Sequence, residues 1–489
     1  MDELVPGAAP TGQPEPSVKC GSYQQNQDST LARSSYGGIK TMRESRYNIW
    51  VEKSGAMYVF NGVSGALLRI STRDYQSLRR FLTGEDEQCA PKVLASLASG
   101  LMLVPDNSDE IAVLAERYQR SRYDTSQFGL TIVTSLGCNF DCPYCFEAKH
   151  PSIMDDEVQQ VLLNVVDDQL HRIKNLRVTW FGGEPLVGKK AVFALSRHFI
   201  DRCDAAQVGY SATITTNGFL LDEETCDQLR ASRVESAQVC LDGPPEVHDQ
   251  MRPLAGGKGT FWQIVENLRH AAQYLNISVR VNVDKQNLAQ AERLMQILVA
   301  EGFAGRIHVY PGQIVGVNDG VPSPSALYHR SCFTNPEFAR AELEFIGLAH
   351  SYGFATRALP SPVATPCTAV RANELVVGSK GEMYKCWESV GNPHEVIGNI
   401  REYKETNGRL QKWLKYDPFC NTECRNCIAL PVCMGGCASH AMDVLQYENR
   451  CGTFRHTYQE QILAFAASAE ARSSATVPAA QLTNRMETR

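Results

Sequence analysis

The alternation of strand-like and helix-like segments after Phe128 is the feature that most constrains the fold of this chain. Amphipathic stretches at 157–170, 261–275 and 292–300, with apolar residues spaced as on one helix face, separate short runs of β-branched residues. Such alternation predicts parallel βαβ units, whose functional residues gather at the carboxyl ends of the strands. The predicted strands are 130–134, 178–181, 212–215, 237–241, 279–283 and 307–310.

Three cysteines follow the first predicted strand in a CxxxCxxC arrangement: Cys138, Cys142 and Cys145. Three thiolates at this spacing can hold a [4Fe–4S] cluster and leave its fourth iron open to a small molecule. A zinc knuckle has similar spacing, but it needs a fourth ligand, and only His150 follows closely. The loop therefore favours an iron–sulfur cluster with one open iron.

Polar segments also follow the later predicted strands. Gly182 and Gly183 let the backbone approach a ligand closely, and the neighbouring Glu184 can pair with an ammonium group. Each later segment alone is an ordinary strand end or turn. Together with the cysteine loop and in this order, they resemble the radical S-adenosylmethionine (SAM) superfamily. The segments are FGGEP at 181–185, TNG at 216–218, CLDGP at 240–244 with HDQMR at 248–252, and VNVD at 281–284.

This resemblance implies a partial (β/α)6 barrel in which Cys138, Cys142 and Cys145 hold a catalytic [4Fe–4S] cluster. In that family an electron from the cluster cleaves bound SAM to a 5′-deoxyadenosyl radical, so the cofactor supplies the chemistry. Serine is usual where this chain has Cys240, so a weak thiol donor replaces a hydroxyl there. The implied SAM contacts are Phe146, Gly182, Gly183, Glu184, Pro185, Thr216, Asn217, Cys240, Arg252 and Asn282.

A second cysteine-rich region begins near residue 360 and resembles the SPASM extension of radical SAM enzymes. The resemblance implies two auxiliary [4Fe–4S] clusters, for three in total. The first of these clusters has only three obvious ligands, Cys367, Cys386 and Cys437. Either Cys332 or Cys420 could be its fourth ligand, or one iron could bind a substrate thiolate. Zinc knuckles or disulfides are the alternative. The first set is Cys367, Cys386 and Cys437, and the second is Cys424, Cys427, Cys433 and Cys451.

The N-terminal region predicts three strands at 47–51, 57–60 and 66–70, followed by helices at 74–82 and 91–97. This pattern resembles the winged-helix peptide-recognition element of peptide maturases, which binds a leader peptide as an added strand. A structural cap on the barrel is the alternative. The expected domains are a disordered tail at 1–42, a winged-helix-like domain at 43–125, the barrel at 126–320, a SPASM domain with a bridging helix at 321–465, and a disordered tail at 466–489.

The chain has 489 residues, 43% of them hydrophobic, and a net charge of −6. This composition predicts a cytoplasmic protein. The negative net charge gives no sign of a nucleic-acid partner, and the N-terminal unit carries acidic and basic side chains in near balance where DNA binding needs a basic stripe. We expect no membrane partner, because no signal peptide or long apolar run occurs. The resemblance as a whole implies an oxidoreductase that matures a ribosomally made precursor peptide with a leader, installing a thioether or carbon–carbon cross-link with electrons from flavodoxin or ferredoxin. The alternatives are an anaerobic sulfatase-maturing enzyme, which makes formylglycine, and a non-catalytic electron-transfer scaffold. The sequence selects no substrate, general base or oligomeric state.

Overall fold

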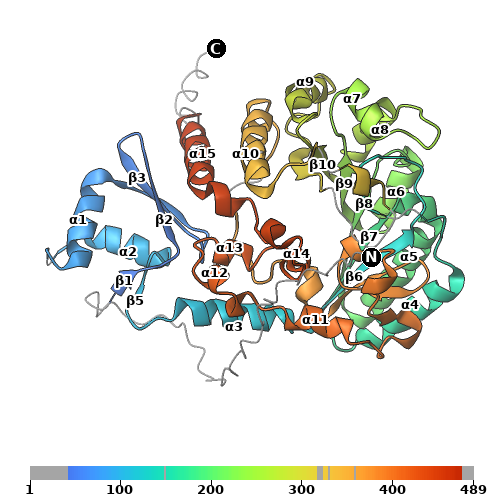
Figure 1. Ribbon diagram of the computed structural model, residues 1–489, viewed down its shortest axis with the longest axis horizontal. Coiled ribbons are helices and arrows are strands. Elements are labelled where there is room, and N and C mark those ends of the chain that lie inside the picture. Colours follow the sequence, from blue (N-terminus) through green and yellow to red (C-terminus); the bar gives the residue numbers. More distant parts are fainter. Residues whose placement is uncertain are drawn as a thin grey trace, which may run out of the picture.

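The computed structural model describes residues 42–475, except 87, 148–149, 316–322, 329–330 and 357–359. The tails predicted at 1–42 and 466–489 lie outside the described residues, apart from Met42 and the last residues of helix α15 (Phe454–Ala475). Figure 1 shows a wide α/β body, which carries the green and yellow segments, and a smaller N-terminal unit in blue beside it.

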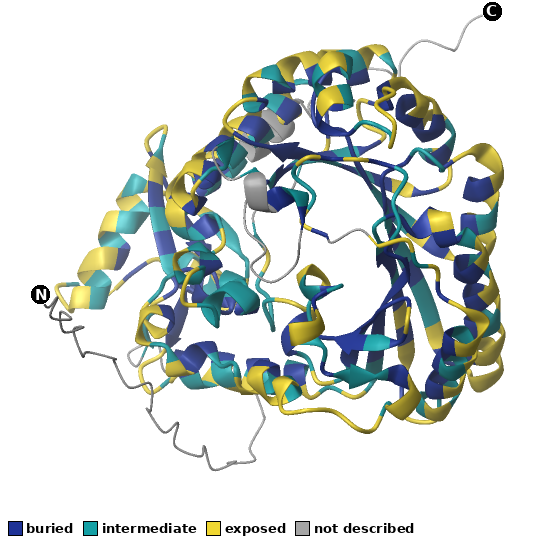
Figure 2. Cartoon of the chain, turned by 45° about the vertical axis from the view of Figure 1, so that its right-hand side comes forward, coloured by how far each residue is buried: buried dark blue, intermediate teal, exposed yellow. Residues whose placement is uncertain are grey.

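A parallel sheet forms the α/β body and confirms the predicted fold class. Six strands pair in chain order, and helices cover their outer side with buried inner faces and exposed outer faces (Figure 2). The strands are β6 (Gln127–Ser135), β7 (Asn175–Gly182), β8 (Gly209–Thr216), β9 (Val234–Cys240), β10 (Asn276–Val283) and β11 (His308–Gln313). The helices are α4 (Asp156–Gln169), α5 (Lys189–Ala206), α6 (Glu223–Ala231), α7 (Pro245–Met251), α8 (Phe261–Ala271) and α9 (Ala291–Ala300).

Local sequence fixes where these helices begin. The carboxylate of Asp155 accepts a hydrogen bond from the Val158 backbone N–H at 2.8 Å and caps α4, and Asp222 caps α6 through Thr225 N–H at the same distance. Strand β6, at the centre of the sheet, is buried along almost its whole length, as expected for a parallel strand covered on both faces.

The chain after residue 320 completes both edges of this sheet. At one edge β12 (Glu374–Val377) pairs in parallel with β6, and β13 (Glu382–Tyr384) and β14 (Gly398–Asn399) follow as antiparallel strands. At the other edge α10 (Asn335–Ser351) contacts β11 and α9. Sequence analysis did not predict β12, because a four-residue run carries too little periodicity to identify a strand.

The N-terminal unit contains a three-stranded antiparallel sheet in the order β2 (Asn48–Lys53), β3 (Ala56–Asn61), β4 (Leu67–Ser71). One face packs against α1 (Thr72–Thr83) and α2 (Pro91–Ser99). The other face packs against the cysteine-rich segment and α15, with Val51 and Phe60 in the shared core. A separate pair, β1 (Met42–Glu44) and β5 (Leu103–Pro105), stands beside them.

Helix α3 (Glu110–Arg122) joins this unit to the rest of the chain. Its Arg122 is 2% exposed, and the guanidinium Nε donates to the Val370 carbonyl at 3.2 Å. Tyr118 Oη donates to the Tyr416 carbonyl at 2.9 Å. The N-terminal unit is therefore bound into the cysteine-rich region by buried polar contacts as well as by apolar packing. Within the stretch of chain that is described, no helix is both long enough and apolar enough to cross a bilayer.

Candidate active site

A cavity of about 960 Å³ lies at the carboxyl ends of the parallel strands. The residues predicted to bind the cofactor line it, apart from Pro185, which is buried and accepts a hydrogen bond from Thr134 Oγ1 at 3.0 Å. The predicted residues in its lining are Cys138, Cys142, Cys145, Phe146, Gly182, Gly183, Glu184, Thr216, Asn217, Cys240, Arg252 and Asn282.

The cysteine loop runs directly from the end of β6. Cys138 Sγ accepts from the Phe140 backbone N–H at 3.4 Å and from Asn217 Nδ2 at 3.9 Å. The same Asn217 amide also donates to Asn139 Oδ1 at 2.7 Å. Donors of this kind favour a thiolate over a thiol, which suits a cluster ligand.

The two glycines after β7 pack against the backbone that leads into the cysteine loop. A Cβ on Gly182 would overlap the Ser135 carbonyl oxygen, and its φ of +138° is one that side chains rarely adopt. A Cβ on Gly183 would lie 2.7 Å from the Leu136 carbonyl oxygen. Sequence analysis assigned these glycines to a close approach of ligand, and both line the cavity. The structure adds that they allow β7 to lie close to the backbone of the cysteine loop.

Glu184 is fully buried at the cavity wall. Its carboxylate accepts from Thr216 Oγ1 at 2.7 Å, the Asn217 backbone N–H at 2.6 Å and the Leu186 backbone N–H at 3.0 Å. Burial raises the pKa of Glu184, while these hydrogen bonds oppose the rise. A ligand ammonium group beside this carboxylate would favour its ionised form, so the position fits a cationic ligand.

A buried polar network lies across the cavity and includes two residues that sequence analysis missed, Tyr144 and Asp242. Tyr144 Oη donates to Asp242 and accepts from Arg252 Nη1 at 2.5 Å. Asn282 donates to Asp242 Oδ1 through both its backbone N–H at 2.9 Å and its Nδ2 at 3.0 Å. The signal for both residues was present, since Tyr144 lies between two predicted cluster cysteines and Asp242 lies in the CLDGP segment.

Arg252 forms an ion pair with Asp242 at 3.6 Å and is 9% exposed. Its Nε is buried and has no hydrogen-bond partner among the described residues. An unpaired buried donor is costly, so this atom fits a ligand with an anionic or acceptor group. The cavity thus offers a carboxylate for a cation, a guanidinium donor for an anion, and three thiols in one loop.

His248 fixes the segment that carries Asp242 and Arg252. Burial and the charge of Arg252 hold the pKa of His248 well below its usual range, so the ring is neutral in the folded chain. Its Nδ1 accepts from the Asp242 backbone N–H at 3.1 Å, and Nε2 therefore carries the proton and donates to Thr260 Oγ1 at 3.0 Å.

We expect this histidine to make stability depend on pH. Below about pH 6.5 the unfolded chain binds a proton at His248 that the folded chain does not, so the free energy of unfolding falls as pH falls, by up to about 1.4 kcal/mol per pH unit. In His248→Asn this contribution is lost. Anaerobic urea unfolding of both proteins at pH 7.5 and 5.5 measures the difference; equal pH dependence in the two would contradict the prediction.

The cysteine-rich region brings its thiols together in two groups. Burial raises the pKa of Cys386, and Glu388 and the thiols of Cys437 and Cys367 raise it further. Burial raises the pKa of Cys424 to about 11, with added effects of Cys433, Cys451 and Cys427. Arg455 Nη1 donates to Cys451 Sγ at 2.9 Å, so a cation also lies beside the second group. A second cavity, of about 1110 Å³, is lined by cysteines of both groups.

The two candidate fourth ligands lie in different places. Cys332 lines the second cavity, and its Sγ donates to the Tyr328 carbonyl at 3.7 Å. Cys420 is exposed and does not line either cavity.

Three comparisons place the chain among known proteins. Residues 132–298 match the family model of the radical SAM superfamily. An AdoMet-dependent heme synthase from Methanosarcina barkeri is 29% identical over 177 residues, which are 36% of this chain and about half (48%) of that relative. A cysteine-type anaerobic sulfatase-maturating enzyme from Clostridium novyi is 22% identical over 329 residues, covering 62% of this chain and 85% of the relative. The solved structure of native anSMEcpe with bound AdoMet and Cp18Cys peptide superposes with a TM-score of 0.51 at 16% identity, covering 72% of this chain and 100% of that one, which shows a shared fold.

Proposed function

Residues 132–298 form a radical SAM domain, and from this premise we propose that the chain is a radical SAM enzyme that modifies a ribosomally made peptide. One observation carries the proposal: the cavity that holds the cysteine loop is also lined by Trp387, Glu388 and His440, which flank the first group of auxiliary cysteines. A cavity of about 960 Å³ has room for SAM together with part of a larger substrate.

The residues of the cavity fit the family's cofactors. Cys138, Cys142 and Cys145 would hold the [4Fe–4S] cluster, Glu184 would bind the amino group of SAM, and Arg252 would bind its carboxylate. When bound and reduced, these cofactors supply a carbon radical that removes a hydrogen atom from the substrate. The chain itself would hold the reacting groups in the cavity at the carboxyl ends of the parallel strands.

The cysteine-rich region would hold two auxiliary [4Fe–4S] clusters, one on each group of thiols. Their redox capacity suits a reaction in which the peptide loses two hydrogens overall, as happens when an intramolecular thioether or carbon–carbon link forms. Flavodoxin or ferredoxin would deliver the electron that SAM cleavage requires.

The N-terminal sheet would bind the leader of the precursor peptide. Its central strand β3 is paired on both sides, so only the outer edges of β2 and β4 remain for an added strand. Deleting the whole unit is a poor test, because it would expose the core that β2 and β3 share with α15.

The test is anaerobic co-expression of the full chain with short peptides encoded beside its gene, followed by intact mass measurement. Loss of two hydrogens per modification with the wild type, and an unmodified peptide with Cys138→Ala, would support a cross-linking enzyme. Fragmentation by tandem mass spectrometry then locates the link, because backbone cleavage inside a ring releases no separate fragments.

Sulfatase maturation is a second candidate function. It is favoured by the match to the sulfatase-maturating enzyme, which covers 85% of that relative's length. A sulfatase-derived peptide that contains the target cysteine is the direct probe. Formylglycine in this peptide, with no change in the neighbouring peptides, would replace the cross-linking proposal with this one.

A further inference from the structure

The first auxiliary group has three cysteines and leaves the fourth ligand of its cluster unassigned. We propose that His440 supplies this ligand through a ring nitrogen and completes the set of Cys367, Cys386 and Cys437. The inference rests on the auxiliary clusters of the proposed function and deepens it.

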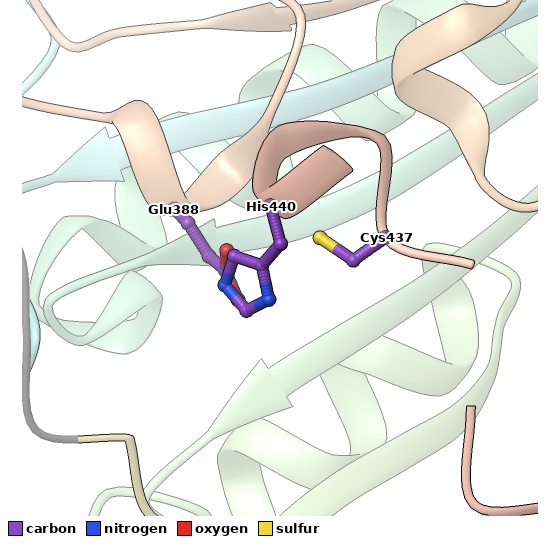
Figure 3. Close-up of side chains that lie close together, drawn as sticks. All are labelled: Glu388, Cys437 and His440. Atoms are coloured by element: carbon purple, nitrogen blue, oxygen red, sulfur yellow. The ribbon is translucent and has the colours of Figure 1, made fainter. Parts of the chain in front are cut away.

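The position of His440 carries the proposal. The residue belongs to α14 (Ala438–Ala441), the short helix that begins directly after Cys437. Ligand atoms of His440, Cys437 and Glu388 all lie within 4.8 Å of one another. Figure 3 shows the imidazole of His440 with the Glu388 side chain and the Cys437 sulfur close to it. Because Glu388 is two residues after Cys386, these contacts bring His440 to the same place as the cysteine group.

The second ring nitrogen of His440 is held as metal-binding histidines usually are. Nδ1 lies 3.1 Å from the backbone carbonyl oxygen of Asn449. A carbonyl oxygen only accepts, so Nδ1 carries the proton and Nε2 keeps its lone pair in the neutral ring. Ligating histidines characteristically donate their other N–H to such a carbonyl, which fixes both tautomer and orientation.

The other candidates fit less well. Glu388 is exposed and offers oxygen, whereas iron–sulfur clusters are held by thiolates and accept imidazole in their place. Cys332 lines the second cavity with the cysteine group, but its Sγ donates to the Tyr328 carbonyl at 3.7 Å, whereas His440 has a ligand atom within 4.8 Å of those of Cys437 and Glu388. Cys420 is exposed and lines neither of the two cavities.

A histidine ligand has a functional consequence. Neutral imidazole in place of an anionic thiolate makes the cluster less negative, and such a replacement raises the reduction potential of an iron–sulfur centre. His440 also lines the cavity that contains the cysteine loop. The cluster face nearest to the substrate would therefore be the one with the neutral ligand, and it would accept an electron more readily than an all-cysteine cluster.

The test measures coupling of histidine nitrogen to the reduced auxiliary clusters. The full chain is made with ¹⁵N-histidine in a Cys138→Ala/Cys142→Ala/Cys145→Ala background, so that the catalytic cluster contributes no signal. Pulsed electron paramagnetic resonance should detect strong ¹⁵N coupling, and His440→Cys should abolish it while retaining the iron. A potentiometric titration should show a lower potential for His440→Cys.

The outcomes separate the alternatives. Absence of ¹⁵N coupling in the chain with intact His440 overturns the proposal, and this result does not depend on the folding of a variant at that position. Persistence of the coupling in His440→Cys also overturns it. Cys332→Ala and Glu388→Gln are the matched controls, and both should retain the coupling. Iron analysis tests the underlying premise independently, because iron for fewer than two clusters in this background would show that at least one auxiliary cluster is missing.

Discussion

Cys138→Ala should abolish cleavage of SAM while leaving most of the bound iron in place. The loop supplies three thiolates, from residues 138, 142 and 145. After the substitution only two remain, and two thiolates are too few to hold a cluster with one open iron. The auxiliary cysteines lie in a separate part of the chain, so their clusters should persist. The measurement is formation of 5′-deoxyadenosine with dithionite as reductant, together with iron content.

Cys226→Ala is the control for this variant. Cys226 is a buried cysteine on α6, inside the barrel core and outside both cysteine groups. We expect it to retain full iron content and SAM cleavage, apart from a modest loss of stability from the small cavity. SAM cleavage by Cys138→Ala at the wild-type rate would refute the assignment of the loop.

Glu184→Gln should weaken SAM binding by about 10- to 100-fold. A hydrogen bond that involves a charged group contributes about 1.5–3 kcal/mol, and each 1.4 kcal/mol corresponds to a factor of ten in Kd. Gln has the shape of Glu but lacks the negative charge that would face the SAM ammonium group. Anaerobic calorimetric titration of SAM into the reconstituted chain measures the change.

The same substitution should also cost some stability. The Asn217 backbone N–H donates to Glu184 Oε2 at 2.6 Å, and an amide NH₂ at that position would leave one donor unpaired. Comparing Kd only among folded samples separates the two effects. Glu157→Gln is the control, since this exposed glutamate on α4 pairs with Arg401 at the surface and should leave Kd unchanged. An unchanged Kd in Glu184→Gln would exclude the assigned role.

The central strands were predictable because their signal is local. Each one is a short run of β-branched residues between helical patterns, and the polar residue that follows it must lie at the carboxyl end of the sheet. The order of these segments along the chain is therefore enough to group Glu184, Asn217 and Asn282 around one site. The order of the segments did not predict β12, because its pairing with β6 joins residues more than 240 positions apart.

The cavity also contains residues whose role depends on partners far away in sequence. Tyr144 is fixed by Asp242 and Arg252, about a hundred residues later, and the spacing of the cysteines alone gives it no role. Gly182 also lies against the Ser135 backbone, a contact that its sequence context did not predict.

The sequence by itself determined the order of strands and helices, the cysteine loop and the grouping of polar residues at strand ends, because periodicity and short-range spacing record these features. Only the tertiary structure decided which distant residues meet. It buried Glu184 among three donors and brought His440 beside Cys437 and Glu388. It also gave Arg252 Nε no hydrogen-bond partner within the part of the chain that the structure describes. The physical reason is that such contacts depend on how separate elements pack, and packing across long sequence distances leaves no periodic trace in the chain.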